Sequence, residues 1–88
     1  MVEQMVKVQN RAGIHARPAM VLVQATIKFQ SSILIEKQEI QVNAKSIMGI
    51  ITLGAGYGTE LKLIVDGEDE QEAISTLVNL FNTKFEEE

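Results

Sequence analysis

The feature that most restricts the fold of this chain is the spacing of its apolar residues, which changes repeatedly between a strand-like and a helix-like pattern within only 88 residues. Four short segments have the alternating or wholly apolar pattern of β-strands, namely residues 2–8, 32–36, 40–43 and 59–66. Three segments have apolar residues at helical spacing, namely residues 16–29, a short stretch after Ser46, and the segment from Glu68 onward. The predicted element order is therefore β-α-β-β-α-β-α.

This order allows few architectures. A chain of this length buries only about 60% of its unfolded surface, so nearly every element must contribute to one core. Short connections in this order favour a split-βαβ arrangement with antiparallel pairing. We predict a single domain over residues 1–88, with an α+β two-layer fold. A four-stranded antiparallel sheet would be covered on one face by three helices.

Each predicted helix has a defined apolar face. In the first helix this face comprises Ala19, Leu22, Val23, Thr26 and Ile27. Ser46 is expected to be the N-cap of the short helix, and the residues expected to face the core are Ile47, Ile50 and Ile51. In the last helix the core positions are Ala73, Ile74, Leu77, Val78, Phe81 and Phe85.

The composition excludes several classes of function. The chain has no cysteine, which excludes disulfides and thiol chemistry. The N-terminal residues lack the apolar stretch of a signal peptide, and no run approaches about 18 apolar residues. We therefore expect a cytoplasmic protein without membrane insertion. The net charge of −4 argues against direct nucleic-acid binding, which usually requires a basic patch.

The stretch GIHARPA, residues 13–19, contains the only histidine and the only proline of the chain. Pro18 is tolerated only in the first turn of a helix, so the helix should start at about residue 15 or 16, with His15 at its cap. The backbone N–H groups of such a helix end attract anions, and its field favours the neutral, nucleophilic imidazole. Arg17 adds a guanidinium that can hold a phosphoryl group. Together these residues suit a histidine that accepts a phosphoryl group.

Two simpler interpretations of His15 compete with this one. A lone histidine at a helix start is often an ordinary surface residue beside a turn. A metal site would need carboxylates for all its other ligands, because the chain has no second histidine and no cysteine. We therefore expect neither a metal nor another cofactor.

Ser46 and its neighbours also allow two interpretations. Ser46 is either an ordinary N-cap, worth about 1 kcal/mol, or a phosphorylation site at a helix end that accommodates negative charge. Met48 and Thr52 are expected on the outer side of the short helix, where an exposed methionine is either a docking contact or plain surface. The glycine-rich stretch GAGYG, residues 54–58, has the wrong spacing for a nucleotide loop and is predicted to be a flexible connection.

The motif GIHARPA, followed about thirty residues later by KSIMGI, resembles the HPr family. These are the histidine-containing phosphocarrier proteins of the bacterial phosphoenolpyruvate:sugar phosphotransferase system. The resemblance covers essentially the whole chain in length and element order. It implies an open-faced β-sandwich with three helices and a stoichiometric phosphocarrier rather than a turnover enzyme. Gln24 and Ile27 are neutral where enteric relatives carry lysines, which bears on the choice of partner.

The resemblance also implies roles for individual residues. His15 would accept the phosphoryl group on Nδ1 from phospho-enzyme I and pass it to sugar-specific IIA domains, with Arg17 assisting. Ser46 would be the regulatory serine that HPr kinase/phosphorylase modifies, after which the protein acts with a catabolite control protein in carbon catabolite repression. The docking residues would be Met20, Ile47, Met48, Ile51 and Thr52. We expect the protein to be a monomer.

Two other classes of function stay open at this point. An HPr-like regulatory paralogue would act mainly through phospho-Ser46 in carbon catabolite repression. Paralogues of that kind lack the active histidine, however, whereas this chain retains His15. A structural module without phosphotransfer would leave both motifs unexplained.

Overall fold

The computed structural model describes residues 1–86 and confirms the predicted element order. The strands are β1 (Val2–Lys7), β2 (Ser32–Lys37), β3 (Ile40–Asn43) and β4 (Glu60–Asp66). The helices are α1 (Ala16–Thr26), α2 (Ile47–Thr52), α3 (Glu70–Asn82) and a short 3-10 turn, η1 (Lys84–Glu86). The end of the predicted domain, residues 87–88, lies outside the described residues.

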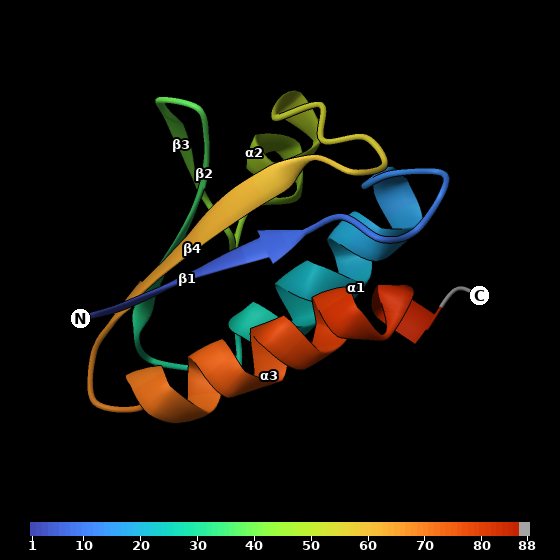
Figure 1. Ribbon diagram of the computed structural model, residues 1–88. Helices are drawn as coiled ribbons and strands as arrows, with labels where there is room; N and C mark the ends of the chain where they lie inside the picture. The colour runs from blue at the N-terminus through green and yellow to red at the C-terminus, as the bar shows by residue number, and fades with distance from the viewer. Residues whose placement is uncertain (87–88) are drawn as a thin grey trace.

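The four strands form one antiparallel sheet in the order β1-β4-β2-β3. Strand β4 lies between β1 and β2, with pairs such as Leu63 to Gln4 on one side and Leu63 to Ile35 on the other. The helices cover one face of this sheet and leave the other face open, as Figure 1 shows. The predicted two-layer α+β fold is therefore confirmed.

The core lies between the sheet and the helices. Alternate residues of β4 point into it, so Leu61, Leu63 and Val65 are fully buried, as the period of two predicts. The largest fully buried side chains from the helices are Leu22, Ile50, Leu77 and Phe81. One helix face and one sheet face thus bury each other, and both fix the position of α1, which carries the candidate histidine.

Helix α1 is shorter than predicted, because it ends at Thr26 rather than near Phe29. The buried Thr26 hydroxyl lies within hydrogen-bond distance of the carbonyl oxygens of Val23, at 2.9 Å, and Ala44, at 3.1 Å. These bonds hold the helix end against the segment before α2, and the Phe29 amide then donates to the Thr26 carbonyl as the chain turns toward β2. Ile27 was predicted on the core face, but it lies past the helix end and is 60% exposed.

Helix α3 also ends earlier than predicted, at Asn82, because Lys84 and Phe85 adopt left-handed φ values of 58° and 55°. The turn brings Phe85 onto Phe81 in an edge-to-face contact with 4.8 Å between ring centroids. Phe85 is 3% exposed, so its predicted place in the core is right, although it is not reached through the helix. Its burial stabilises a backbone conformation that costs about 1–2 kcal/mol per residue by itself.

Helix α2 has only six residues, so just one of its isoleucines reaches deep into the core. Ile50 is 1% exposed, whereas Ile47 and Ile51 are each 38% exposed. The prediction that all three face the core is therefore right for Ile50 and wrong for the other two. Ile47 and Ile51 are four residues apart and lie at the edge of the core, on the same side of the helix.

A carboxylate joins the start of α3 to the start of β2. Asp69 accepts bonds from the Ser31 hydroxyl, from the Gln30 amide at 2.9 Å and from the Ser31 amide at 3.0 Å. These donors, the Ser31 hydroxyl first among them, hold the pKa of Asp69 below its usual value of 3.8. Gly67 permits the close approach, because a Cβ there would lie 2.6 Å from the Ser31 Cα.

We predict that Asp69→Asn lowers the thermal unfolding temperature at neutral pH and removes part of its pH dependence. Because the pKa of Asp69 is depressed in the folded state, its ionised form stabilises the fold above about pH 5, and this contribution is lost as the pH falls through 3.8 and below. The difference in Tm between wild type and variant should therefore shrink as the pH falls. Circular dichroism melts between about pH 7 and pH 2 measure it. Glu68→Gln is the control for removing an exposed charge nearby, and a pH-independent difference for Asp69→Asn would contradict the prediction.

Candidate functional site

The histidine turn, residues 10–15, is held mainly by backbone contacts. The Gly13 amide donates to the Asn10 carbonyl at 3.0 Å, and the Asn10 side-chain amide donates to the Gly13 carbonyl at 2.6 Å. Gly13 has a φ of 76°, and a Cβ at this position would lie 2.9 Å from the Ala55 carbonyl oxygen. The Ile14 amide donates to that same carbonyl at 2.9 Å. The turn therefore has one orientation relative to the loop that follows α2.

His15 is the N-cap residue of α1, as predicted, with extended backbone angles of −92° and −164°. Its carbonyl accepts the first helical bond, from the Ala19 amide at 3.0 Å. Its side chain is exposed and does not cap the helix. The N–H groups of the first turn point out of the helix at this end. An anionic group carried on the imidazole would therefore lie near the positive end of α1.

Arg17 and Met20 lie on the exposed side of the first turns of α1, while Pro18 and Ala19 are buried. Pro18 occupies the first turn, where its missing N–H removes no helical bond. Burial of Pro18 and Ala19 fixes the rotation of α1 about its axis, which keeps Arg17 at the surface. Arg17 and His15 are therefore both exposed at the same end of α1.

Ser46 is the N-cap residue of α2, as predicted. Its hydroxyl oxygen accepts a bond from the Gly49 amide at 3.1 Å, and its carbonyl accepts one from the Ile50 amide, also at 3.1 Å. At the other end of α2, the Lys37 ammonium donates to the Leu53 carbonyl at 2.9 Å. A cation at this end also complements the helix dipole. The short helix is therefore stabilised at both ends.

The predicted docking residues lie on α1 and α2, two helices that pack against each other (Figure 1). We name these residues the α1–α2 surface: Met20, Ile47, Met48, Ile51 and Thr52. Met48 is the most exposed of the apolar ones, at 67%, followed by Met20 at 48%. None of the five carries a charge, so a partner docked here would meet apolar side chains first.

The glycine-rich loop before β4 does more than connect two elements, and its prediction as a flexible connection is wrong. Ala55 is 3% exposed, and its carbonyl accepts the bond from Ile14. Farther along, the Gly58 amide donates to the Val8 carbonyl at 2.8 Å, and the Val8 amide donates to the Thr59 carbonyl at 2.9 Å. The loop thus holds both the end of β1 and the histidine turn. The signal in the sequence was Gly13, since a Cβ there would lie 2.9 Å from the Ala55 carbonyl oxygen and from the Gly56 Cα.

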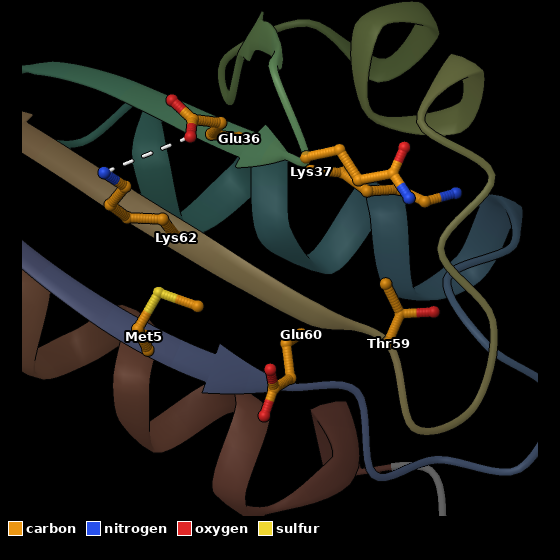
Figure 2. Close-up of a pocket in the computed structure, with 7 residues that line it drawn as sticks. Met5, Glu36, Lys37, Thr59, Glu60 and Lys62 are labelled. Atoms are coloured by element: carbon orange, nitrogen blue, oxygen red, sulfur yellow. Dashed lines mark ion pairs between the residues drawn. The ribbon is translucent and has the colours of Figure 1, made fainter.

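A cavity of about 400 Å³ lies apart from these residues, on the open face of the sheet, and none of the predicted site residues lines it. Figure 2 shows Lys62 of β4 directed toward Glu36 of β2, with which it forms an ion pair at 4.0 Å. Lys62 also lies 3.7 Å from Glu3 of β1. Lys62 is thus paired with carboxylates on both neighbouring strands, and none of the residues of the histidine turn lines this cavity.

Residues 2–83 match the family model described as "PTS HPr component phosphorylation site". The chain is 53% identical to the phosphocarrier protein HPr of Treponema pallidum (strain Nichols) over 88 residues, which cover all of both chains. The crystal structure of HPr-C-His from Thermoanaerobacter tengcongensis has a TM-score of 0.96 and 50% identity, and the match covers 100% of this chain and 99% of that chain. The crystal structure of Crh from Bacillus subtilis, described as a swapped dimer, has a TM-score of 0.77 and 45% identity, with coverage of 96% and 97%.

The fold and these matches define a small open-faced α+β protein of the phosphotransferase system. The chain belongs to the HPr family of phosphocarrier proteins, and Crh proteins are among its relatives. The resemblance found in the two sequence motifs is therefore confirmed. Among residues 1–86, no helix has both the length and the apolar content to cross a membrane.

We predict that Gly13→Ala destabilises the protein more than Gly54→Ala, which is a matched control. Both residues have positive φ values, of 76° and 62°, so both substitutions carry the left-handed backbone penalty of about 1–2 kcal/mol. Only at Gly13 would the new Cβ collide with backbone, at 2.9 Å from the Ala55 carbonyl oxygen, whereas nothing lies within 4 Å at Gly54. The collision adds about 1–3 kcal/mol. Urea unfolding of both variants measures the difference, and equal losses would show that the close contact contributes nothing.

Proposed function

We propose that this protein is a phosphocarrier that accepts a phosphoryl group on His15 from phospho-enzyme I and passes it to sugar-specific IIA domains. The observation that supports this most is the exposed imidazole at the N-cap of α1, in a chain of the HPr family. The neutral imidazole uses the lone pair of Nδ1 to form a phosphorus–nitrogen bond. The bond between phosphorus and its carrier atom on enzyme I breaks, and its electron pair stays with that atom. Transfer to a IIA domain breaks the bond to Nδ1 and returns neutral His15.

In this mechanism Arg17 and the end of α1 stabilise the charge on the phosphoryl oxygens. Phosphoryl transfer depends mainly on positioning and on electrostatic stabilisation of the three outer oxygens. The first-turn N–H groups of α1 and the Arg17 guanidinium supply donors to that position. Burial of Pro18 and Ala19 holds these donors in place before the phosphoryl group arrives.

The α1–α2 surface would dock the partners. Its exposed methionines can adapt to partners of different shape, since methionine side chains are flexible and polarisable. Ser46 is the N-cap residue of α2, the helix that carries Ile47 and Met48, two of the proposed docking residues. A change of charge at Ser46 would therefore act directly on docking.

We further propose that Ser46 is a regulatory phosphorylation site for an HPr kinase/phosphorylase. A phosphate there would add close to two negative charges at the N-terminus of α2, where the Gly49 amide already donates to the serine oxygen. The phosphorylated protein would then act with a catabolite control protein in carbon catabolite repression.

The alternative function is that of a regulatory paralogue that acts mainly through phospho-Ser46. The relationship to Crh, a catabolite repression protein, supports it. The retained His15 favours the phosphocarrier. For either function we propose a cytoplasmic location and a monomer in which β1 pairs with β4 of its own chain.

We predict that His15→Ala abolishes phosphoenolpyruvate-dependent phosphorylation, because the accepting nitrogen is removed. Arg17→Ala should slow transfer by about 10- to 100-fold, since one charge-assisted donor to the phosphoryl oxygens is lost. Intact mass after incubation with phosphoenolpyruvate and bacterial enzyme I measures both, with Lys28→Ala as a control for the loss of an exposed positive charge. The added mass should disappear in acid, because phosphohistidine is acid-labile. Labelling that persists in His15→Ala would reject His15 as the acceptor.

We predict that Ser46→Asp slows phosphorylation of His15 by about tenfold, because its negative charge would oppose docking of an acidic patch on enzyme I. Ser46→Asn is the matched control, since asparagine also caps a helix well but carries no charge. Initial rates of labelling at low and high salt measure the effect, which salt should reduce. Equal rates for the two variants would argue against electrostatic control by Ser46.

A further inference from the structure

A second cavity, of about 320 Å³, lies where three separate segments meet. These segments are the end of β1, the loop before β4 and the turn after α3, and Figure 1 shows that they reach the same side of the molecule. The lining residues are Lys7, Val8, Gln9, Tyr57, Gly58 and Lys84. None of them has a role in the proposed phosphotransfer.

The wall of this cavity is cationic. Among the described lining residues Lys7 and Lys84 carry the charge, and Tyr57 adds a phenol hydroxyl. Within residues 1–85 neither lysine makes an ion pair or a side-chain hydrogen bond, although Glu60 lies directly across from Lys7 in the β1–β4 register. Two lysines therefore line one cavity in a chain with a net charge of −4. A cavity lined by two ammonium groups attracts anions.

Contacts between the three segments join them before any ligand arrives. Lys84 has a left-handed φ of 58°, and burial of the aromatic ring that follows it stabilises this turn. The Gln9 side-chain amide donates to the Asn82 side-chain oxygen at 3.3 Å, which joins the end of β1 to the end of α3. The Gly58 amide donates to the Val8 carbonyl at 2.8 Å, which joins the loop to β1. The segments that carry the donors are thus joined before binding, which reduces the entropy lost in ordering them.

We propose that this cavity binds a small phosphate monoester. The two ammonium groups and the Tyr57 hydroxyl supply donors for the phosphate oxygens, and hydrogen bonds from charged donors are the strong ones. The volume is at the lower end of the range for small-molecule sites, which fits a compact anion better than a nucleotide. Binding is noncovalent, and His15 is not among the residues that line the cavity. The inference therefore goes beyond the proposed phosphocarrier function and does not depend on it.

The test is a two-dimensional amide NMR titration of the full chain with glycerol 2-phosphate, at constant ionic strength set with sodium chloride. We expect saturable shifts at the amides of Gln9, Gly58 and Lys84. Lys7→Gln and Lys84→Gln should each raise the Kd by about tenfold, because each removes one charged donor. Lys28→Gln, which changes an exposed lysine beyond the far end of α1, should leave the Kd unchanged.

Several outcomes would overturn the proposal. Shifts that do not saturate, shifts centred on Ala16 and Arg17, or the same Kd in all three lysine variants would each do so. A parallel titration with inorganic phosphate shows whether the cavity prefers free phosphate or a phosphate monoester. Tighter binding of inorganic phosphate than of the monoester would reject the monoester. His15→Ala should bind the monoester like the wild type. Failure of this site and failure of phosphotransfer at His15 are thus separate results.

Discussion

The contact between the backbone at Gly13 and the backbone at Ala55 sets the geometry on which the rest of the site depends. Gly13 has no Cβ, so the histidine turn can lie against the loop that follows α2, and the Ile14 amide then donates to the Ala55 carbonyl at 2.9 Å. The same loop pairs with the end of β1 through Gly58. One short connection therefore places the start of α1 relative to α2 and to the sheet. Because backbone makes these contacts, substitution of exposed side chains nearby leaves them intact.

The two candidate modification sites are both N-caps, yet they leave their helices in different states. Ser46 satisfies an amide of α2 with its own hydroxyl oxygen, through the bond from Gly49. His15 makes no such bond, so the first-turn amides of α1 stay directed outward beside the imidazole. An uncapped helix end suits a group that arrives and leaves, because its donors are available to the incoming anion. At the capped end of α2, an added group would instead rearrange the existing bond between the Ser46 oxygen and the Gly49 amide.

The charged residues are distributed unevenly between the helix end at His15 and the rest of the molecule. Acidic residues are concentrated between Glu60 and Glu72. Two carboxylates of that stretch accept hydrogen bonds. Asp69 accepts them from Ser31 and Gln30, and Glu70 accepts one from the Gly67 amide at 3.1 Å. The open face of the sheet pairs its lysine at position 62 with carboxylates on both neighbouring strands. The helix end at His15 carries Arg17 instead. A protein that is acidic overall thus keeps a positive region where a phosphoryl group would be handled.

Much of the fold could be predicted because hydrophobic periodicity is a local property. The alternation in β4 identifies Leu61, Leu63 and Val65 as core residues from their own order in the chain. Pro18 and Ser46 likewise mark the starts of α1 and α2, since proline in the first turn and serine at the cap act within a few residues. The element order, the starts of α1 and α2 and the place of the histidine at a helix end were therefore determined by the sequence itself, whereas α3 starts at Glu70, two residues after the predicted Glu68.

Only the tertiary structure decided where the helices end and how the histidine turn is held. Helix α1 ends at Thr26 because its hydroxyl meets the Ala44 carbonyl, which belongs to a segment 18 residues farther along the chain. The chain leaves α3 after Asn82 in a left-handed turn that places Phe85 against Phe81. The bond from Ile14 to Ala55 likewise joins segments that meet only after folding. Local patterns report what a segment prefers, whereas these features depend on groups that are distant in sequence and become neighbours only when the core has formed.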